Sequence, residues 1–289
     1  MPSTRIPSPR LSAALLRATA LELVVLAGHT LLYPTGITGE RPPAGGAEPG
    51  RAMAGTPGGQ TAPTPAPAGT TALPADHPER PPVVLLHGFI DNRSVFVLLR
   101  RSLARYGWHH LESLNYSPLT CDIRTAAELL DRHIEEICAR TGHREVDIVG
   151  HSLGGLIARY YVQRLGGDRR VRTLVTLGTP HGGTSVAPLA AAHPIVRQMR
   201  SGSAPIEELR LPAPGCRTRF VSFWSELDQV IVPVEAACID HPDLDAVNVR
   251  VSGVGHLALP VHPAVAAGVR QALDAPASAH GSADAASVA

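Results

Sequence analysis

The chain has 289 residues, a formal net charge of +1 and 44% hydrophobic residues, with glycine and proline at 27 residues each. A nearly neutral chain lacks the excess of basic residues that typifies nucleic-acid binding, so we expect no nucleic-acid partner. The length allows a substantial buried core. The prolines are unevenly spread, and composition therefore divides the chain into parts.

The first part, residues 1–35, joins basic residues to an apolar run at 18–33. Three arginines precede or enter this run: Arg5, Arg10 and Arg17. Basic residues before an apolar core are typical of a signal peptide or an uncleaved signal anchor. We therefore expect a membrane-anchored or secreted, extracytoplasmic protein, with membrane association through residues 11–33.

The apolar run also contains Glu22 and His29. A charge at the centre of a spanning helix costs about 2.5–3.5 kcal/mol on insertion scales, which the many leucines and valines of the run can outweigh. An amphipathic helix docked on the folded part of the chain is the alternative.

Residues 36–81 consist mainly of proline, glycine, alanine and threonine, with almost no large apolar side chains. Such a segment cannot bury enough surface to offset its chain entropy, so we expect a disordered linker. Residues 276–289 have a similar composition and are expected to form a disordered tail. The folded domain is then residues 82–275.

Short apolar runs alternate with helical patterns along this domain. We predict strands at 83–86, 108–114, 146–149, 171–177, 219–223 and 246–251. We predict helices at 94–106 after a Ser94 cap, from Asp122 to Gly142, at 153–165 and at 263–273. Strands that alternate with helices indicate an α/β fold, a mostly parallel sheet with helices on both faces.

The four cysteines are Cys121, Cys138, Cys216 and Cys238. An even number in an exported protein permits two disulfides, and sequence alone cannot choose among the three pairings. Pairing of 121 with 138 and of 216 with 238 is the simplest arrangement, and four free thiols are the alternative. No pair has the close spacing of a zinc site.

The most informative motif is Gly150-His151-Ser152-Leu153-Gly154, which lies between a predicted strand and a predicted helix. A serine between glycines at such a turn is the sequence form of a nucleophile elbow. The alternative is a glycine-rich turn with an incidental serine. As a nucleophile, Ser152 needs a base to take its proton.

Among 14 histidines, His256 is the best candidate for that base, because it lies in a glycine-rich loop directly after a strand. His241 and His262 lie in proline-flanked segments. His151 belongs to the elbow itself, and we expect its side chain to point away from Ser152.

An acidic residue must hold the imidazole in the correct tautomer. Asp228 follows the strand that ends at Phe223, and Glu226 is its local rival. We prefer Asp228 because the chain turns after it, at 230–233, which leaves Asp228 at the crest of the loop. The order serine, acid, histidine is the one expected for a hydrolase elbow.

Two backbone N–H groups are needed to stabilise the oxyanion. Leu153 follows the nucleophile and supplies one. Phe89 follows His87-Gly88 at the end of the first strand and is placed to supply the other, with Gly88 giving the backbone room. The alternative for His87-Gly88 is a simple turn.

Taken together, five motifs resemble those of bacterial, actinobacterial-type triacylglycerol lipases and esterases of the α/β-hydrolase superfamily. They are Leu86-His87-Gly88-Phe89, Gly150 to Gly155, Gly178-Thr179-Pro180-His181-Gly182-Gly183-Thr184, Asp228 with Val230 and Pro233, and Gly255-His256. The resemblance covers about residues 82–273. It implies an α/β-hydrolase fold and a Ser152–Asp228–His256 triad that cleaves lipid acyl esters through an acyl-enzyme.

The resemblance also implies a cap or lid within residues 185–214, for which an ordinary packed helix pair is the alternative. Some lipases hold a structural calcium near the catalytic histidine, but Asp240, Asp243 and Asp245 form no firm ligand set. We therefore expect no metal and no cofactor. An acyl thioesterase or acyltransferase with the same triad, or a non-catalytic hydrolase-fold binding protein, are the rival functions.

Overall fold

The computed structural model describes residues 17, 19–25, 27, 80–89, 93–114, 116, 122–185, 193–275 and 286–288. Most of the expected linker at 36–81 and most of the expected tail at 276–289 lie outside these residues. The expected domain at 82–275 is described almost throughout.

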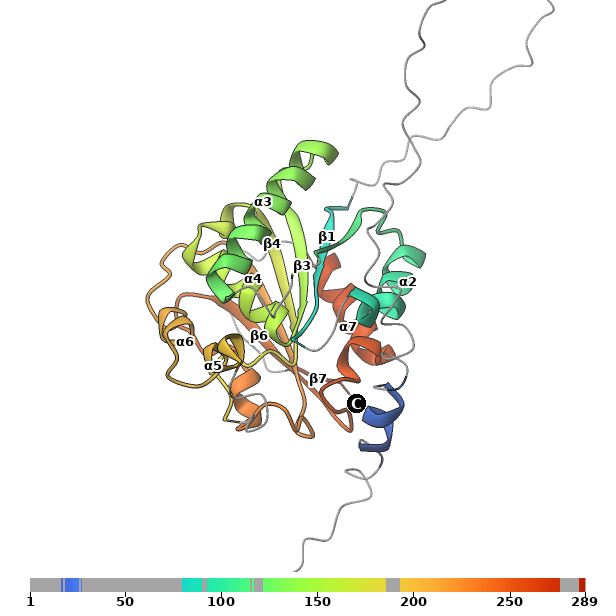
Figure 1. Cartoon of the computed structure of the whole chain (residues 1–289). Helices are drawn as coiled ribbons and strands as arrows, with labels where there is room; N and C mark the ends of the chain where they lie inside the picture. Colours follow the sequence, from blue (N-terminus) through green and yellow to red (C-terminus); the bar gives the residue numbers. More distant parts are fainter. Residues whose placement is uncertain are drawn as a thin grey trace, which may run out of the picture. The chain divides into compact units, whose positions relative to one another are not determined.

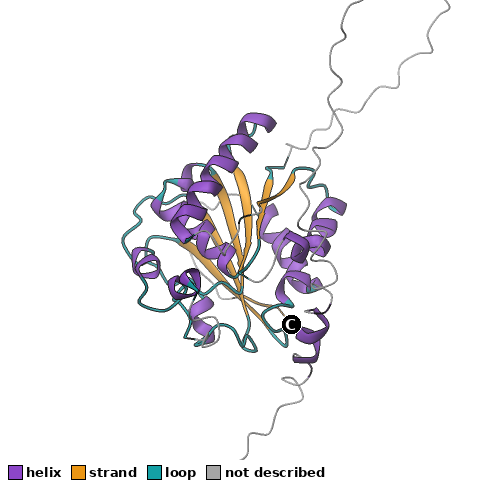
Figure 2. Cartoon of the chain, in the orientation of Figure 1, coloured by secondary structure: helices purple, strands orange, loops and turns teal. Residues whose placement is uncertain are grey.

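A single sheet of seven strands forms the centre of the described structure (Figures 1 and 2). The strands are β1 (Val83–Leu86), β2 (Leu111–Leu114), β3 (Val146–His151), β4 (Val171–Leu177), β5 (Arg219–Trp224), β6 (Asp245–Val251) and β7 (Ala286–Val288). Their order is β2-β1-β3-β4-β5-β6-β7, and every neighbouring pair is parallel. The predicted α/β fold is confirmed, and each of the six predicted strands is present.

The seventh strand differs from expectation. Residues 286–288 belong to the tail that composition predicts to be disordered, yet β7 pairs with β6 from Val249–Ala286 to Val251–Val288. An edge strand presents unpaired N–H and C=O groups that any extended segment can bond, whatever its side chains. Composition therefore does not reveal a strand that forms by backbone pairing at an edge.

Six α-helices accompany the strands within the described residues between 80 and 275. They are α2 (Val97–Arg105), α3 (Ile123–Thr141), α4 (Leu153–Arg164), α5 (Pro194–Gln198), α6 (Ala204–Glu208) and α7 (Pro263–Asp274). Short 3-10 turns occur at η2 (Arg93–Phe96), η3 (Gly167–Arg169), η4 (Val234–Ala237) and η5 (Leu259–Val261).

The predicted caps are met for α3 but not for α2. Asp122 accepts a hydrogen bond from the Thr125 N–H at 2.7 Å, and Gly142 ends α3 in the left-handed conformation that glycine favours. Ser94 lies buried within the 3-10 turn η2, so Phe96 rather than Ser94 precedes α2. A 3-10 turn is a common start to an α-helix, and sequence spacing does not separate the two.

Helices cover both faces of the sheet, as Figure 1 shows. Successive side chains of a strand point to opposite faces. Accordingly, Val84 and Leu86 of β1 pack with α3 and α4, whereas Val83 and Leu85 pack with α2 and α7. Strands covered on both faces are apolar along their whole length, which explains the continuous run at 83–86.

The described part of the expected lid is a packed helix pair. Ile195 of α5 and Ile206 of α6 are fully buried in the same apolar cluster as α3 and α4. Glu208 at the end of α6 pairs with Arg124 of α3 and accepts a 2.5 Å hydrogen bond from Tyr160 of α4. The described apolar residues that suggested a lid are buried in this cluster: Ile195, Val196, Met199, Ile206 and Leu209. Residues 186–192 lie outside the described chain.

The local disulfide pairing is wrong. Cys138, Cys216 and Cys238 are free thiols, and Cys121 lies outside the described residues. Burial raises the pKa of Cys238 to about 11, which keeps this thiol protonated and unreactive at neutral pH. An even count of cysteines says nothing about their distances in the fold.

The sheet contains a switch point between β1 and β3. From β1 the chain runs to β2 on one side, and it then returns to place β3 on the other side of β1. In such sheets the crevice beyond the carboxyl ends of the two strands is the usual binding site. Phe89 follows β1 and Ser152 follows β3, so two of the candidate residues lie at this point.

Candidate active site

Ser152 joins β3 to α4 in a strained conformation. Its φ of 52° is the one positive φ at a non-glycine position within the described chain. Three hydrogen bonds hold this backbone: the Ser152 N–H donates to the Leu177 carbonyl, and the Ser152 carbonyl accepts from the Gly155 N–H and the Thr179 hydroxyl, all at 3.0–3.1 Å. A backbone held in this way keeps the serine in the elbow conformation.

The glycines of the motif are required by close packing. A Cβ on Gly150 would lie 2.6 Å from the Gly155 Cα, and one on Gly155 would lie 2.0 Å from the Thr179 hydroxyl oxygen. A Cβ on Gly154 would lie 2.2 Å from the Leu86 carbonyl oxygen at the end of β1. The elbow therefore sits directly against both neighbouring strands.

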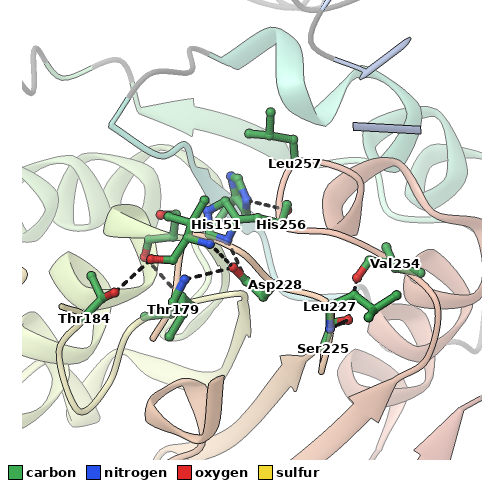
Figure 3. A network of polar contacts seen from close by, with 12 residues as sticks. His151, Thr179, Thr184, Ser225, Leu227, Asp228, Val254, His256 and Leu257 are labelled. Carbon is green, nitrogen blue, oxygen red and sulfur yellow. Dashed lines mark hydrogen bonds and ion pairs between the residues drawn. The ribbon is translucent and has the colours of Figure 1, made fainter. Parts of the chain in front are cut away.

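Asp228 and His256 form a direct buried pair (Figure 3). His256 Nδ1 lies 2.7 Å from Asp228 Oδ2, and the two residues are 4% and 5% exposed. Asp228 Oδ1 also accepts hydrogen bonds from the backbone N–H groups of Val230, at 2.8 Å, and Ile231, at 3.0 Å. The carboxylate is thus fixed on one side by its own loop and holds the imidazole on the other.

This environment keeps Asp228 ionised. Burial alone raises the pKa of the carboxyl, but the charge and hydrogen bond of His256 and the two backbone N–H groups outweigh it. The pKa of Asp228 therefore lies below its ordinary value. An ionised partner fixes the proton of a neutral imidazole on Nδ1 and leaves Nε2 as an acceptor.

The rival residues lie elsewhere. Glu226 pairs with Arg250 at 3.2 Å on the surface. His241 contacts the Leu211 carbonyl, and His262 precedes α7. None of these contacts involves His256.

His151 contributes a contact that sequence reasoning missed. Its Nε2 lies 3.3 Å from the His256 carbonyl oxygen, and the two rings are 4.9 Å apart. Gly178 closes the group, because a Cβ there would lie 3.1 Å from His256 Nδ1 and 3.2 Å from Asp228 Oδ2. Since Leu177 receives the Ser152 N–H, these contacts gather Ser152, Asp228 and His256 at one edge of the sheet.

Hydroxyl side chains tie the surrounding loops together (Figure 3). The buried Ser225 hydroxyl donates to the Val254 carbonyl and so links the loop of Asp228 to the loop of His256. The Thr184 hydroxyl donates to the Val230 carbonyl at 2.8 Å. No local pattern marks these residues, because their partners are distant in the sequence.

The two expected oxyanion donors lie on neighbouring elements. Leu153 is the first residue of α4, and its N–H is among the four that a helix leaves without an intrahelical partner. Phe89 follows β1, whose end contacts Gly154. The Tyr116 hydroxyl donates to the His87 carbonyl, and the Tyr116 ring stacks on His87 at 4.6 Å, so an aromatic side chain supports the Phe89 loop.

The Phe89 ring meets a second aromatic ring. Phe89 is half-buried, and its ring lies 5.2 Å from that of His193, the residue that caps α5.

Among the described residues, no group of three or more histidine, cysteine, aspartate or glutamate side chains could hold a metal. Asp243, which the sequence left unassigned, accepts a 2.7 Å hydrogen bond from the Ala213 N–H.

A parallel sheet with a strained serine after a central strand, and a buried Asp–His pair beyond later strands, is the architecture of the α/β-hydrolase class. Comparisons with known proteins agree. The sequence model of the palmitoyl protein thioesterase family matches residues 82–210. A triacylglycerol lipase of Pseudarthrobacter phenanthrenivorans is 37% identical over 60 residues, which are 21% of this chain and 18% of that lipase.

Solved structures resemble the fold. Aspergillus fumigatus lipase B has a TM-score of 0.59 at 17% identity, over 68% of this chain and 53% of that one. The lin2722 gene product of Listeria innocua has a TM-score of 0.52 at 16% identity, over 72% of this chain and 97% of that one. The chain therefore has the α/β-hydrolase fold, and its resemblance to bacterial lipases is confirmed; the sequence match spans under a fifth of that relative's length.

Proposed function

We propose that this protein is a serine carboxylic ester hydrolase that cleaves lipid acyl esters. The observation that carries the proposal is the buried 2.7 Å pair of His256 and Asp228, which lies at the same edge of the sheet as the strained Ser152. The half-buried Phe89, which packs against the apolar cluster of α3 and α4, favours an apolar acyl group over a charged substrate.

In the proposed reaction, the Ser152 hydroxyl oxygen attacks the acyl carbon while His256 takes its proton. The Phe89 and Leu153 N–H groups stabilise the oxyanion. His256 then gives the proton to the leaving alcohol as the ester bond breaks. Water, deprotonated by His256, attacks the acyl-enzyme and releases the acid and Ser152.

Hydrolysis of p-nitrophenyl acyl esters by the full chain and by Ser152→Ala tests this proposal. We expect the variant to lose activity and to keep its fold, as judged by circular dichroism. A fluorophosphonate probe separates an enzyme from a non-catalytic binding protein, because it should label the unmodified protein and not the variant. Activity that survives Ser152→Ala would refute the assignment.

A thioester substrate is the second candidate, because the matching family model is that of palmitoyl protein thioesterases. The same serine, histidine and oxyanion donors serve both bonds. Matched oxygen esters and thioesters of increasing acyl length decide between them: the higher kcat/KM identifies the substrate class. An acyl transfer function would instead require product formation with an added alcohol.

We also propose that the protein associates with a membrane surface outside the cytoplasm. Leu21, Leu23 and Val24 are exposed, at 38%, 63% and 69%. Exposed apolar side chains on a helix favour lipid interfaces. None of the helices among the described residues combines the length and the hydropathy needed to cross a bilayer.

Two measurements test this proposal. The protein should float with lipid vesicles, and replacing Leu23 and Val24 by serine should reduce flotation. Cell fractionation should find the protein outside the cytoplasm. A protein that stays in the cytoplasm and ignores vesicles would contradict the proposal.

A further inference from the structure

Glu22 makes two hydrogen bonds to the loop that carries His256. Residues 19–25 are helical, and Glu22 is half-buried on this helix. Its Oε2 accepts from the Leu257 N–H at 3.0 Å, and its Oε1 accepts from the Ala258 N–H at 2.9 Å. One carboxylate thus binds the two backbone donors that directly follow His256.

Further contacts support the same docking. Val25, three residues along the helix, packs against the apolar cluster that includes α2 and α7. The Thr19 hydroxyl accepts a 3.4 Å hydrogen bond from the Gln229 side chain, next to Asp228. The helix therefore contacts the loops of both the acid and the base.

The surface of the His256 loop is shaped to receive the carboxylate. Gly255 precedes His256, and a Cβ at Gly255 would lie 2.6 Å from the Glu22 carboxyl carbon. Glycine leaves the space that the carboxylate fills. The positions on both sides of His256 are thus occupied by contacts with Glu22.

Hydrogen bonds from backbone N–H groups to a carboxylate are about twice as strong as those between neutral groups. They fix Leu257 and Ala258, whose neighbour His256 must hold its ring within hydrogen-bond reach of Ser152 and Asp228. A glycine-flanked loop does not fix that position by itself.

We propose that Glu22 is a positioning residue for His256, and that the helix at 19–25 is a working part of the hydrolase domain. The inference rests on the proposed serine hydrolase function, because it assigns His256 as the base. Glu22 does not touch the reacting atoms; it acts through the backbone that follows His256. It also gives a role to the one carboxylate within the N-terminal apolar run.

The test compares Glu22→Ala and Glu22→Gln in the full chain. We expect Glu22→Ala to lower kcat by about 10- to 100-fold with KM little changed, because misplacing a catalytic group affects the reaction more than binding. Glu22→Gln keeps one acceptor oxygen and should lose less. The control is Glu207→Gln, which removes an exposed carboxylate from α6 and should leave kcat unchanged.

A second variant reaches the same contact from the other side. Gly255→Ala should displace the Glu22 carboxylate and lower kcat, and it should cost much less when Glu22 is already alanine. Such non-additivity is expected only for residues that share one interaction. Additive losses would overturn the proposed contact.

Hydrogen exchange separates this inference from the proposed function. The amides of Leu257 and Ala258 should exchange slowly in the unmodified protein and faster in Glu22→Ala. If the unmodified protein shows no hydrolysis and no fluorophosphonate labelling, the proposed function fails, and the positioning role with it. If the protein is active but Glu22→Ala matches or exceeds its kcat, or leaves exchange unaltered, the positioning role alone is refuted.

Discussion

Replacing Asp228 by asparagine is the sharpest test of the proposed triad. The carboxylate accepts three hydrogen bonds, from His256 at Oδ2 and from Val230 and Ile231 at Oδ1. The asparagine oxygen can keep the two backbone bonds, which places its NH₂ group where Oδ2 was. An NH₂ group only donates, so His256 Nδ1 must accept and the ring proton moves to Nε2.

The two consequences differ in size. Because two of the three bonds survive, we expect the free energy of unfolding to fall by only about 1.5–3 kcal/mol, the usual contribution of a hydrogen bond to a charged group. Turnover should fall on the order of 10⁴-fold, because a protonated Nε2 cannot take the serine proton. That decrease corresponds to about 5.5 kcal/mol in activation free energy.

The assay is hydrolysis of p-nitrophenyl butyrate, measured together with urea unfolding of the same samples. Glu226→Gln is the matched control, since Glu226 pairs with Arg250 on the surface and should affect neither quantity strongly. Nearly unchanged activity in Asp228→Asn, or an equal loss in Glu226→Gln, would show that Asp228 does not orient the base.

Three further outcomes are expected. Gly155→Ala should lower the free energy of unfolding by about 1–3 kcal/mol, despite the helix preference of alanine, because its Cβ would meet the Thr179 side chain. Adding Thr179→Ala should restore part of this loss in a thermal melt. If the double variant showed no recovery, the contact between Gly155 and Thr179 would be contradicted. Cys216 and Cys238 should both react with a thiol reagent when the protein is unfolded in the absence of a reductant. If neither reacted, they would be joined in a disulfide, and their assignment as free thiols would be wrong. Because the pKa of Asp228 in the folded protein lies below its ordinary value of about 3.9, the ionised carboxylate should stabilise the fold at pH values above about 3.9. This stabilisation should disappear as the pH falls through the pKa of the folded protein. Asp228→Asn should therefore lose less stability than the unmodified protein as the pH falls, and an equal loss in the two proteins would refute this.

The strands and the elbow were predictable because their signals are local. The apolar run at 146–149 and the glycines around Ser152 each report a constraint met within a few residues. Chain order then placed Asp228 and His256 after later strands of a parallel sheet, where carboxyl ends share one edge. The structure puts these two side chains 2.7 Å apart.

Contacts between distant segments were not predictable. The Ser225 hydroxyl and the His151 ring meet the His256 loop only after the sheet has formed. Similarly, the apolar residues at 194–209 suit either a lid or a core, and only packing against α3 decides for the core. The separation of Cys216 from Cys238 likewise depends on tertiary structure.

The N-terminal segment shows what hydropathy alone leaves out. A scale of transfer energies treats Glu22 as a cost, because it has no term for a specific partner. The structure supplies two N–H donors for that carboxylate, at 3.0 Å and 2.9 Å. Glu22, which hydropathy treats only as a cost of membrane insertion, therefore has a specific partner in the loop of His256.

The strained conformation of Ser152 depends on hydrogen bonds to its backbone. A non-glycine residue in such a conformation costs about 1–3 kcal/mol. The hydrogen bonds from Ser152 to Leu177, and from Gly155 and Thr179 to the Ser152 carbonyl, supply about 0.5–1.5 kcal/mol each, enough to offset that cost. Only the Thr179 bond comes from a side chain, so Thr179→Ala should relax the elbow. The activation free energy of hydrolysis should then rise by more than the free energy of unfolding falls. A lower melting temperature with unchanged turnover would refute this reasoning.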